Sequence, residues 1–202
     1  MKEHQTKTAI LSQGESALVQ DGVRNFTVED IAKTLFISKK TIYKFFPTKD
    51  NLIESIVDFI ISHVENHFKS TLKKDISPVA KFHELINYAL NQLGRFQLQR
   101  MADMKARYPN IWLKIEAFRE QCQKDIITVF LEAKSQDLVH ADLDLQAASP
   151  ILLKMINAIF QPEFLIHNNL TPPQAVETYY HMISSGIFTA KGQKELDKLR
   201  KS

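Results

Sequence analysis

The stretch "ISKKTIYKFFPTKDNL", residues 37–52, mixes lysines with aromatic and aliphatic side chains ahead of a proline. Ile42 and Phe46 are four residues apart, so they share one side of a helix, while Lys40 and Lys44 share another side. The proline then ends this helix, because proline cannot continue the backbone hydrogen-bond ladder. The stretch therefore predicts a short helix with an apolar inner face and a cationic outer face.

A second short helix is predicted directly before this one, in "TVEDIAKTL", residues 27–35. Thr27 is a good N-cap, and Asp30 three residues later makes a near-match to a capping box. The residues "FIS" separate the two helices, and Ser38 is the predicted cap of the second one. Two short helices joined by a three-residue turn form a helix-turn-helix unit. A longer helix with a continuous apolar period follows, from residue 48 to about residue 72.

The charge pattern of this segment differs from that of the whole chain. The 202 residues carry a net charge of only +3, yet no acidic residue occurs between Ile31 and Lys49. That interval contains five lysines, which are Lys33, Lys39, Lys40, Lys44 and Lys49. A basic patch suits a polyanion, and lysine can read guanine acceptors and phosphate oxygens in the major groove of DNA. A solvated lysine face explains the same composition, so charge by itself leaves both interpretations open.

The rest of the chain is predicted to be helical as well, because it has only five glycines and its apolar residues recur at three and four. A first helix is expected from about Thr6 to Asp21, ended by Gly22, with Gly14 inside it at a close helix contact. The polar tail, residues 191–202, is predicted to fray. Further helices are expected at about 78–94, from 109 onward, at 144–160 and at 172–188.

The helix-turn-helix segment resembles the tetracycline-repressor (TetR) family of transcriptional regulators. The matching features are "IL" at 10–11, Gly22, Thr27 with Ile31–Ala32, "SKKTIYKFF" at 38–46 and "PTKDNL" at 47–52. This resemblance covers about the first quarter of the chain. It implies an all-α fold, with a helix-turn-helix DNA-binding domain at 4–64 and a helical effector-binding and dimerisation domain at 65–202. It also implies a set of DNA-facing residues, which are Thr27, Lys39, Lys40, Thr41, Tyr43, Lys44 and Lys49.

Two positions depart from the family pattern, and both concern DNA recognition. Phe36 stands in the turn where the family usually carries glycine, and Lys40 stands where the recognition helix often has glycine. A phenylalanine in the left-handed conformation costs roughly 1–2 kcal/mol. We therefore expect the turn to shift, or Phe36 to pack as additional core, and we expect Lys40 to alter the preferred bases.

By resemblance, the protein is a ligand-responsive regulator, in the family's usual mode a repressor, that binds a two-fold DNA operator as a homodimer. The helices at 144–160 and 172–188 would pair with those of a second copy, and small residues would allow close approach. These small residues are Ala147, Ala148, Ala158, Ser184, Ser185 and Gly186. A ligand entering the C-terminal core would reorient the fourth helix, spread the recognition helices and relieve repression.

The effector is predicted to be a mainly apolar small molecule, because the C-terminal half is rich in aromatic and methionine side chains. The candidates for lining its cavity are Trp112, Phe118, Phe130, Met155 and Phe160, and ordinary core packing is the competing explanation for each. His83 or Tyr88 is a candidate polar anchor.

The competing classes are a small all-α enzyme and a helical interaction protein that does not bind DNA. No glycine-rich phosphate loop or nucleophile motif occurs, so we expect neither catalysis nor a cofactor. His63 and His67 have the spacing of a metal-binding pair but no evident third ligand, so no metal is expected. Cys122 is alone, which fits a buried, inert thiol in a reducing compartment. With no predicted signal peptide or membrane span, we expect a cytoplasmic protein without a membrane partner.

Overall fold

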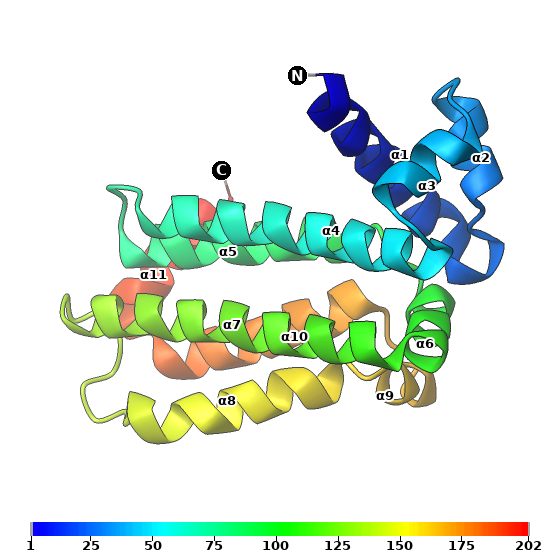
Figure 1. The fold of residues 1–202 in the computed structure, drawn as a ribbon. Helices are drawn as coiled ribbons and strands as arrows, with labels where there is room; N and C mark the ends of the chain where they lie inside the picture. Colours follow the sequence, from blue (N-terminus) through cyan, green and yellow to red (C-terminus); the bar gives the residue numbers. More distant parts are fainter. Residues whose placement is uncertain (1, 202) are drawn as a thin grey trace. The chain divides into compact units, whose positions relative to one another are not determined.

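The computed structural model describes residues 2–201, and within that range it contains helices and no strands (Figure 1). The N-terminal helices are α1 (Lys2–Asn25), α2 (Val28–Thr34), α3 (Lys39–Phe45) and α4 (Lys49–Leu72). The central ones are α5 (Pro78–Leu93), α6 (Leu98–Arg107) and α7 (Pro109–Lys134). The C-terminal ones are α8 (Leu145–Ile159), α9 (Pro162–His167), α10 (Pro172–Ile187) and α11 (Ala190–Leu199). The predicted all-α fold with an N-terminal helix-turn-helix is confirmed.

Contacts divide the chain into two compact units. The first unit reaches to His63 and also includes Gln99–Leu113, and the second comprises Val64–Leu98 and the residues from Lys114 onward. The sequence did not indicate that Gln99–Leu113, which holds most of α6, packs with the N-terminal helices. The predicted domain boundary between residues 64 and 65 stays a prediction.

The core of the first unit is built where α1, α2, α3 and the start of α4 turn their apolar sides toward one another. Its fully buried side chains include Ile10, Phe26, Ile31, Ile42, Leu52 and Ile56. Gly14 lies against Ile56, and a Cβ atom there would come within 2.8 Å of the Ile56 Cγ1 atom. The predicted close helix contact at Gly14 is therefore confirmed.

Helix α1 is longer than the sequence indicated at both ends. It begins at Lys2, and it continues past Gly22 through a kink at which that glycine has φ 68° and ψ 172°. Glycine tolerates this backbone conformation because it has no Cβ atom. The expected stop at Gly22 is thus a kink, after which one more turn leads to Asn25.

In the second unit, α5 packs against α10 and α11, and α8 packs against α9 and α10. An aromatic cluster forms its centre, in which the ring centroids of Phe82 and Phe130 are 5.3 Å apart and Phe188 lies edge-on to both. The cluster joins α5 and α7 to the residue that follows α10.

The C-terminal tail differs from its expected state. Residues 190–199 form α11, which begins at the N-cap Thr189 and buries Leu196 completely. The polar segment is held in place because α11 packs against α5, and because Glu195 accepts a hydrogen bond from Ser77 and Gln193 donates one to the Ser184 carbonyl. Helices α6 and α9 were also missed, since α9 has only six residues and charged side chains interrupt the apolar residues of α6.

Candidate nucleic-acid interface

Helix α3 has two chemically distinct faces. Ile42 and Phe46 are buried at 0% and 2% exposure, so they fasten the helix to the first unit. Lys40 and Lys44 are exposed on the other side, and Tyr43 beside them is 42% exposed. Phe45, whose orientation the sequence did not indicate, is half-buried. The arrangement presents a short cationic surface on a rigid helix, as a major-groove reader requires.

Hydroxyl caps set the start of each helix around this surface. The Thr27 Oγ1 atom accepts from the Asp30 N–H at 3.1 Å, and the Ser38 Oγ atom accepts from the Thr41 N–H at 3.1 Å. The Thr48 Oγ1 atom likewise accepts from the Asn51 N–H at 3.0 Å. The three predicted caps are confirmed. Of the side chains expected to face DNA, Thr27 and Thr41 are half-buried, and each hydroxyl lies in its local capping network.

Two of the exposed lysines are held by carboxylates from other helices. Lys39 pairs with Glu29 of α2, and Lys44 pairs with Glu3 of α1 at 2.5 Å between Nζ and Oε1. The hydrogen bonds from Lys44 and Lys39 lower the pKa values of Glu3 and Glu29, and the bond to Glu29 raises the pKa of Lys39. Sequence reasoning missed both acids, because a helical pattern relates residues only three or four positions apart. Glu3 is 41 residues from its lysine, and Glu29 is 10 residues from its own.

The turn between α2 and α3 keeps the left-handed conformation, so the expectation that it would shift or bury Phe36 is wrong. Phe36 has φ 54° and is 96% exposed. Its N–H donates to the Lys33 carbonyl at 3.1 Å, and the Ile37 N–H donates to the Ala32 carbonyl at 3.0 Å. This pair of bonds is a Schellman motif, which places a left-handed residue where Phe36 stands. The hydrogen bonds of the helix end offset a conformational cost of roughly 1–2 kcal/mol.

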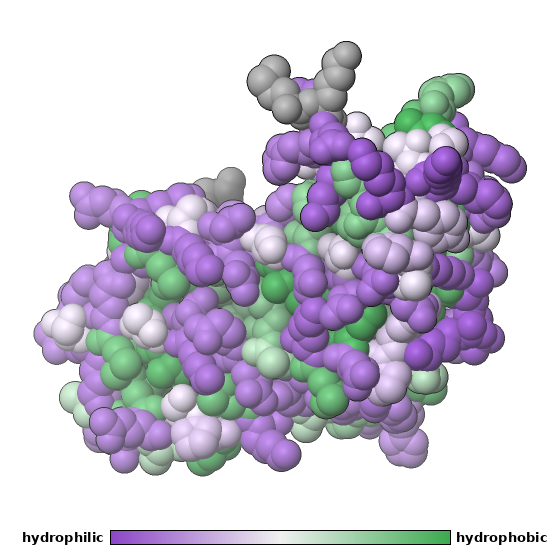
Figure 2. Space-filling model, viewed as in Figure 1, coloured by the Kyte–Doolittle hydropathy of each residue, from purple (hydrophilic) through white to green (hydrophobic). Residues whose placement is uncertain are grey.

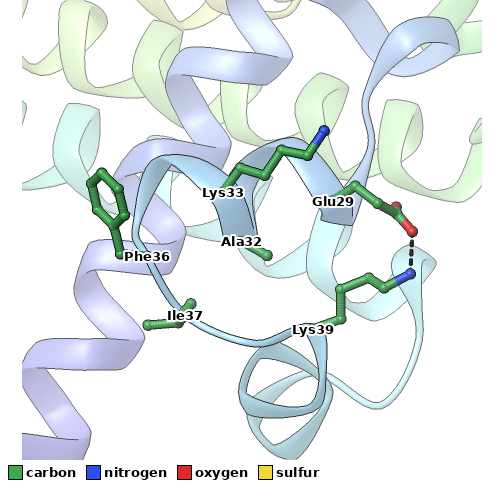
Figure 3. A pocket seen from close by; sticks show the side chains of 6 residues that line it. All are labelled: Glu29, Ala32, Lys33, Phe36, Ile37 and Lys39. Atoms are coloured by element: carbon green, nitrogen blue, oxygen red, sulfur yellow. Dashed lines mark hydrogen bonds and ion pairs between the residues drawn. The ribbon is translucent and has the colours of Figure 1, made fainter.

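A shallow hollow of about 590 Å³ lies beside this turn, and Figure 3 shows its lining. Phe36 stands at one end of the hollow, and the Glu29–Lys39 ion pair stands at the other. Ala32 lies between them, and Ile37 and Lys33 complete the wall. The hollow therefore combines an apolar end with a charged end.

Polar contacts within the first unit attach the α6 region to α1 and to the start of α4. Arg24 pairs with the mostly buried Asp103 at 2.6 Å, and Arg100 donates to the Val19 carbonyl. The Tyr108 hydroxyl donates to Asp50 Oδ1 at 3.0 Å, and burial together with this bond raises the pKa of Tyr108 to about 12. These contacts stabilise the arrangement of α1, α4 and α6 within the first unit.

Lys49 begins α4 and is the last side chain that resemblance assigned to DNA. It is half-buried, and its Nζ atom lies 5.8 Å from the centroid of the Phe26 ring. A cation over an aromatic face is favourable, so this contact holds the ammonium group near the start of α4.

The five candidate ligand-lining residues occupy different environments. Trp112 is buried in the first unit, whereas the other four belong to the second unit. There, Phe130 lies in the aromatic cluster, Phe160 carries the Arg119 guanidinium 4.9 Å above its ring, and Phe118 is half-buried. Met155 is 38% exposed on α8, so it does not share the interior with Phe130.

The second unit also holds a buried polar contact that the sequence did not reveal. Gln123 has no exposed surface, and its Oε1 atom accepts from the buried Tyr180 hydroxyl at 3.0 Å. Its Nε2 atom has no hydrogen-bond partner within residues 2–201. An amide donor without a partner in such a place is costly, and a bound acceptor would satisfy it.

The two histidines with metal-ligand spacing and the single cysteine pack against neighbouring side chains. His63 lies edge-on to Phe59, and His67 stacks on Tyr88 with ring centroids 3.6 Å apart. Across the described residues, no group of three or more His, Cys, Asp or Glu side chains is arranged to hold a metal ion. Burial raises the pKa of the half-buried Cys122 thiol, which favours its protonated form. None of the helices between residues 2 and 201 is long and apolar enough to cross a membrane.

Comparisons with known proteins agree with this geometry. Residues 10–56 match the family model of bacterial regulatory proteins of the tetR family. The helix-turn-helix regulator YvaF of Bacillus subtilis is 20% identical over 179 residues, which cover 88% of this chain and 93% of YvaF.

Two solved structures share the fold. A transcriptional regulator from Saccharomonospora viridis, in complex with choline, has a TM-score of 0.69 at 14% identity and covers 92% of this chain and 99% of its own. The fatty acid degradation regulator FadR from Bacillus halodurans has a TM-score of 0.60 at 16% identity, with 89% and 95% covered. These two matches show that the chain has the same fold as solved transcriptional regulators. Residues 10–56 are therefore similar to the DNA-binding region of tetR-family regulators, and the chain resembles a helix-turn-helix transcriptional regulator over most of its length.

Proposed function

We propose that the protein is a ligand-responsive repressor that binds a two-fold operator as a homodimer and reads it with α3. The observation that carries the DNA-reading part is the exposed Lys40–Lys44 surface on a helix whose other face is buried. The DNA-facing set would be Thr27, Lys39, Lys40, Thr41, Tyr43, Lys44 and Lys49. Lys40 and Lys44 would enter the groove, and the half-buried threonines and Lys49 would contact phosphates at its edges. Such a repressor acts in the cytoplasm, where its operator is.

A double substitution tests this surface. Lys40→Ala with Lys44→Ala should leave the fold intact, because alanine favours helix and neither lysine is buried. Affinity for a duplex selected by the parent protein should fall, and each lost phosphate contact should lower the slope of log K against log salt by about 0.9. Lys194→Ala with Lys198→Ala is the matched control, since it removes two exposed lysines at the same spacing from α11.

The interface is refuted if the Lys40 and Lys44 variant is folded by circular dichroism and binds like the parent at every salt concentration. It is also refuted if the α11 control loses as much affinity and slope as the α3 variant. In that case net charge alone, and not the α3 surface, would determine binding.

Dimerisation is supported by apolar side chains that α8 and α10 leave exposed. Ile151 and Met155 on α8 are 60% and 38% exposed, and Met182 on α10 is 64% exposed. The two helices are in contact, so these side chains belong to neighbouring surfaces. Around them, Ala147, Ala158, Ser185 and Gly186 are exposed, Ala148 is half-buried, and Ser184 is fully buried and so does not line an outer surface. Small residues beside apolar ones permit close helix packing with a second copy.

Sedimentation equilibrium tests the dimer. The parent should sediment at twice the chain mass of 23.3 kDa, and Ile151→Lys with Met182→Lys should sediment as a monomer. Leu131→Lys with Leu113→Lys is the control, because these leucines are 52% and 60% exposed on α7, which carries none of the side chains of the proposed dimer surface. A monomeric parent, or a control as disruptive as the test variant, would rule out this surface.

The effector is proposed to be mainly apolar with one hydrogen-bond acceptor. The aromatic cluster around Phe82 and Phe130 supports the apolar part, and the Gln123 amide supports the acceptor. His83 and Tyr88, the two candidate anchors, are engaged with Asn87 and His67. The regulator from Saccharomonospora viridis holds choline, and FadR is named for fatty acid degradation, so ligand chemistry differs among proteins of this fold.

A thermal-shift screen checks the effector class. Apolar carbonyl or carboxylate compounds should raise the melting temperature of the parent, and the shift should shrink in Gln123→Leu. If only multiply charged metabolites raise the melting temperature, the proposal fails.

For induction, the ligand must bind the state with low DNA affinity better than it binds the state with high DNA affinity, or the equilibrium between them does not shift. Helix α4 contributes residues to both units and is the proposed transmitter.

A further inference from the structure

Phe36 has an exposed ring and a left-handed backbone, and neither property stabilises the folded chain. A single exposed apolar side chain is ordinary on a protein surface, so its 96% exposure carries little by itself. The left-handed backbone is different, because glycine would complete the same Schellman motif without the steric penalty. A ring that lies almost entirely in solvent makes too little contact with its own chain to offset that penalty.

The residues around Phe36 indicate the chemical character of a partner that could bind over its ring. Figure 2 shows hydrophobic colouring at the turn between α2 and α3, with hydrophilic residues around it. The hollow beside the ring is lined by Lys33 and Lys39 against one acid, Glu29, so its net charge is positive. The acid-free interval from Ile31 to Lys49 extends the positive charge on the side of α3. This charge complements a polyanion that also offers small apolar surfaces.

The position of the turn in the helix-turn-helix indicates which part of DNA would meet Phe36. Phe36 precedes the N-cap of α3 by two residues, so it flanks the N-terminal end of the recognition helix. In a docked helix-turn-helix, the second helix lies in the major groove and the first crosses the sugar–phosphate backbone. A residue between these helices is therefore close to the backbone and not to base edges.

We infer that the Phe36 ring packs on a deoxyribose of the operator backbone, while Lys33 and Lys39 neutralise the phosphates on either side of that sugar. Lys39 exchanges Glu29 for a phosphate oxygen when DNA binds. The contact rests on the proposed DNA interface, and it extends that interface to a side chain that carries no charge. Because every nucleotide has the same sugar, the ring adds affinity without sequence preference.

The test compares variants of the full-length protein on a duplex selected by the parent and on a scrambled duplex. Phe36→Gly keeps the left-handed turn and removes the ring. It should raise the melting temperature by roughly 2–4 °C, because the steric penalty disappears. Its affinity should fall about threefold per subunit, the size expected when a small part of the ring no longer leaves water. The loss should be equal on both duplexes and at every salt concentration, because no phosphate contact is removed.

Two further variants separate the ring from the charges and from the turn. Phe36→Tyr keeps an aromatic ring and should retain parental affinity within about twofold. Lys33→Ala removes a cation beside the ring and should lower the salt slope by about 0.9 per subunit. Phe36→Gly should therefore raise the melting temperature while it weakens DNA binding. A ring with only a structural role would not produce these opposite changes.

Three results would overturn the contact. The first is Phe36→Gly binding as tightly as the parent while the Lys40 and Lys44 variant loses affinity, which refutes the sugar contact and leaves the interface intact. The second is a loss confined to duplexes with two adjacent operators, which assigns the ring to a neighbouring copy of the protein. The third is unchanged binding by both variants, which refutes the DNA interface itself.

Discussion

Gly14 is the position where the packing of the first unit can be tested most directly. Alanine there would gain about 1 kcal/mol of helix propensity relative to glycine. Its Cβ atom would also come within 2.8 Å of Ile56 Cγ1 and closer still to Ile56 Cδ1. Ile56 is fully buried, so its side chain can give way only by displacing other core side chains. Overpacking of this kind costs about 1–3 kcal/mol.

The two effects give a net destabilisation of about 1 kcal/mol for Gly14→Ala. The melting temperature should fall by roughly 2–4 °C in a protein of this length, measured by differential scanning calorimetry. Gly94→Ala is the control, because Gly94 ends α5 in a right-handed conformation and an added Cβ meets only an ordinary contact at 3.4 Å. That control should be neutral or slightly stabilising.

A double-mutant cycle connects the effect to the named contact. Ile56→Val removes the Cδ1 atom and should cost about 1 kcal/mol in the parent. In the Gly14→Ala background the same change should cost less, because it also relieves the overlap, which gives a coupling of about 1 kcal/mol. Additive effects, or a Gly14→Ala melting temperature that rises as much as that of Gly94→Ala, would refute the close-contact explanation.

Three other outcomes are expected. Glu3→Gln with Glu29→Gln should raise affinity for the selected duplex about twofold to fivefold in fluorescence anisotropy, because DNA no longer competes with these carboxylates for the α3 lysines; unchanged affinity would show that the ion pairs do not compete. Cys122 should react with a thiol reagent at pH 8 only after denaturant is added, since burial raises its pKa; rapid labelling of the native protein would contradict this. Burial lowers the pKa of His67 below 6.5, so the unfolded chain binds the proton more readily and the melting temperature should fall from pH 7 toward pH 5; His67→Asn should reduce that pH dependence, and an unchanged profile would exclude this cause.

The local features of the helix-turn-helix segment were determined by the sequence alone. The caps at Thr27, Ser38 and Thr48 and the inward side of α3 depend on residue type and on a spacing of three or four. Such interactions act within one turn of helix, so a linear pattern contains all of their partners. The boundaries of α2, α3 and α10 followed for the same reason, since a cap or a proline marks each one.

Only the tertiary structure decided which distant groups meet. The pairing of Glu3 with Lys44, the attachment of α6 through Arg24 and Asp103, and the Gln123–Tyr180 contact join residues 41 to 79 positions apart. The attachment of α11 likewise depends on its packing against α5 and on the Ser77–Glu195 hydrogen bond, which joins residues 118 positions apart. Phe36 shows the limit most clearly, because residue preference argued against the left-handed turn. Two backbone hydrogen bonds at the end of α2 retain that conformation, and the buried Ile31 and Ile42 hold the helices on either side of the turn in the core.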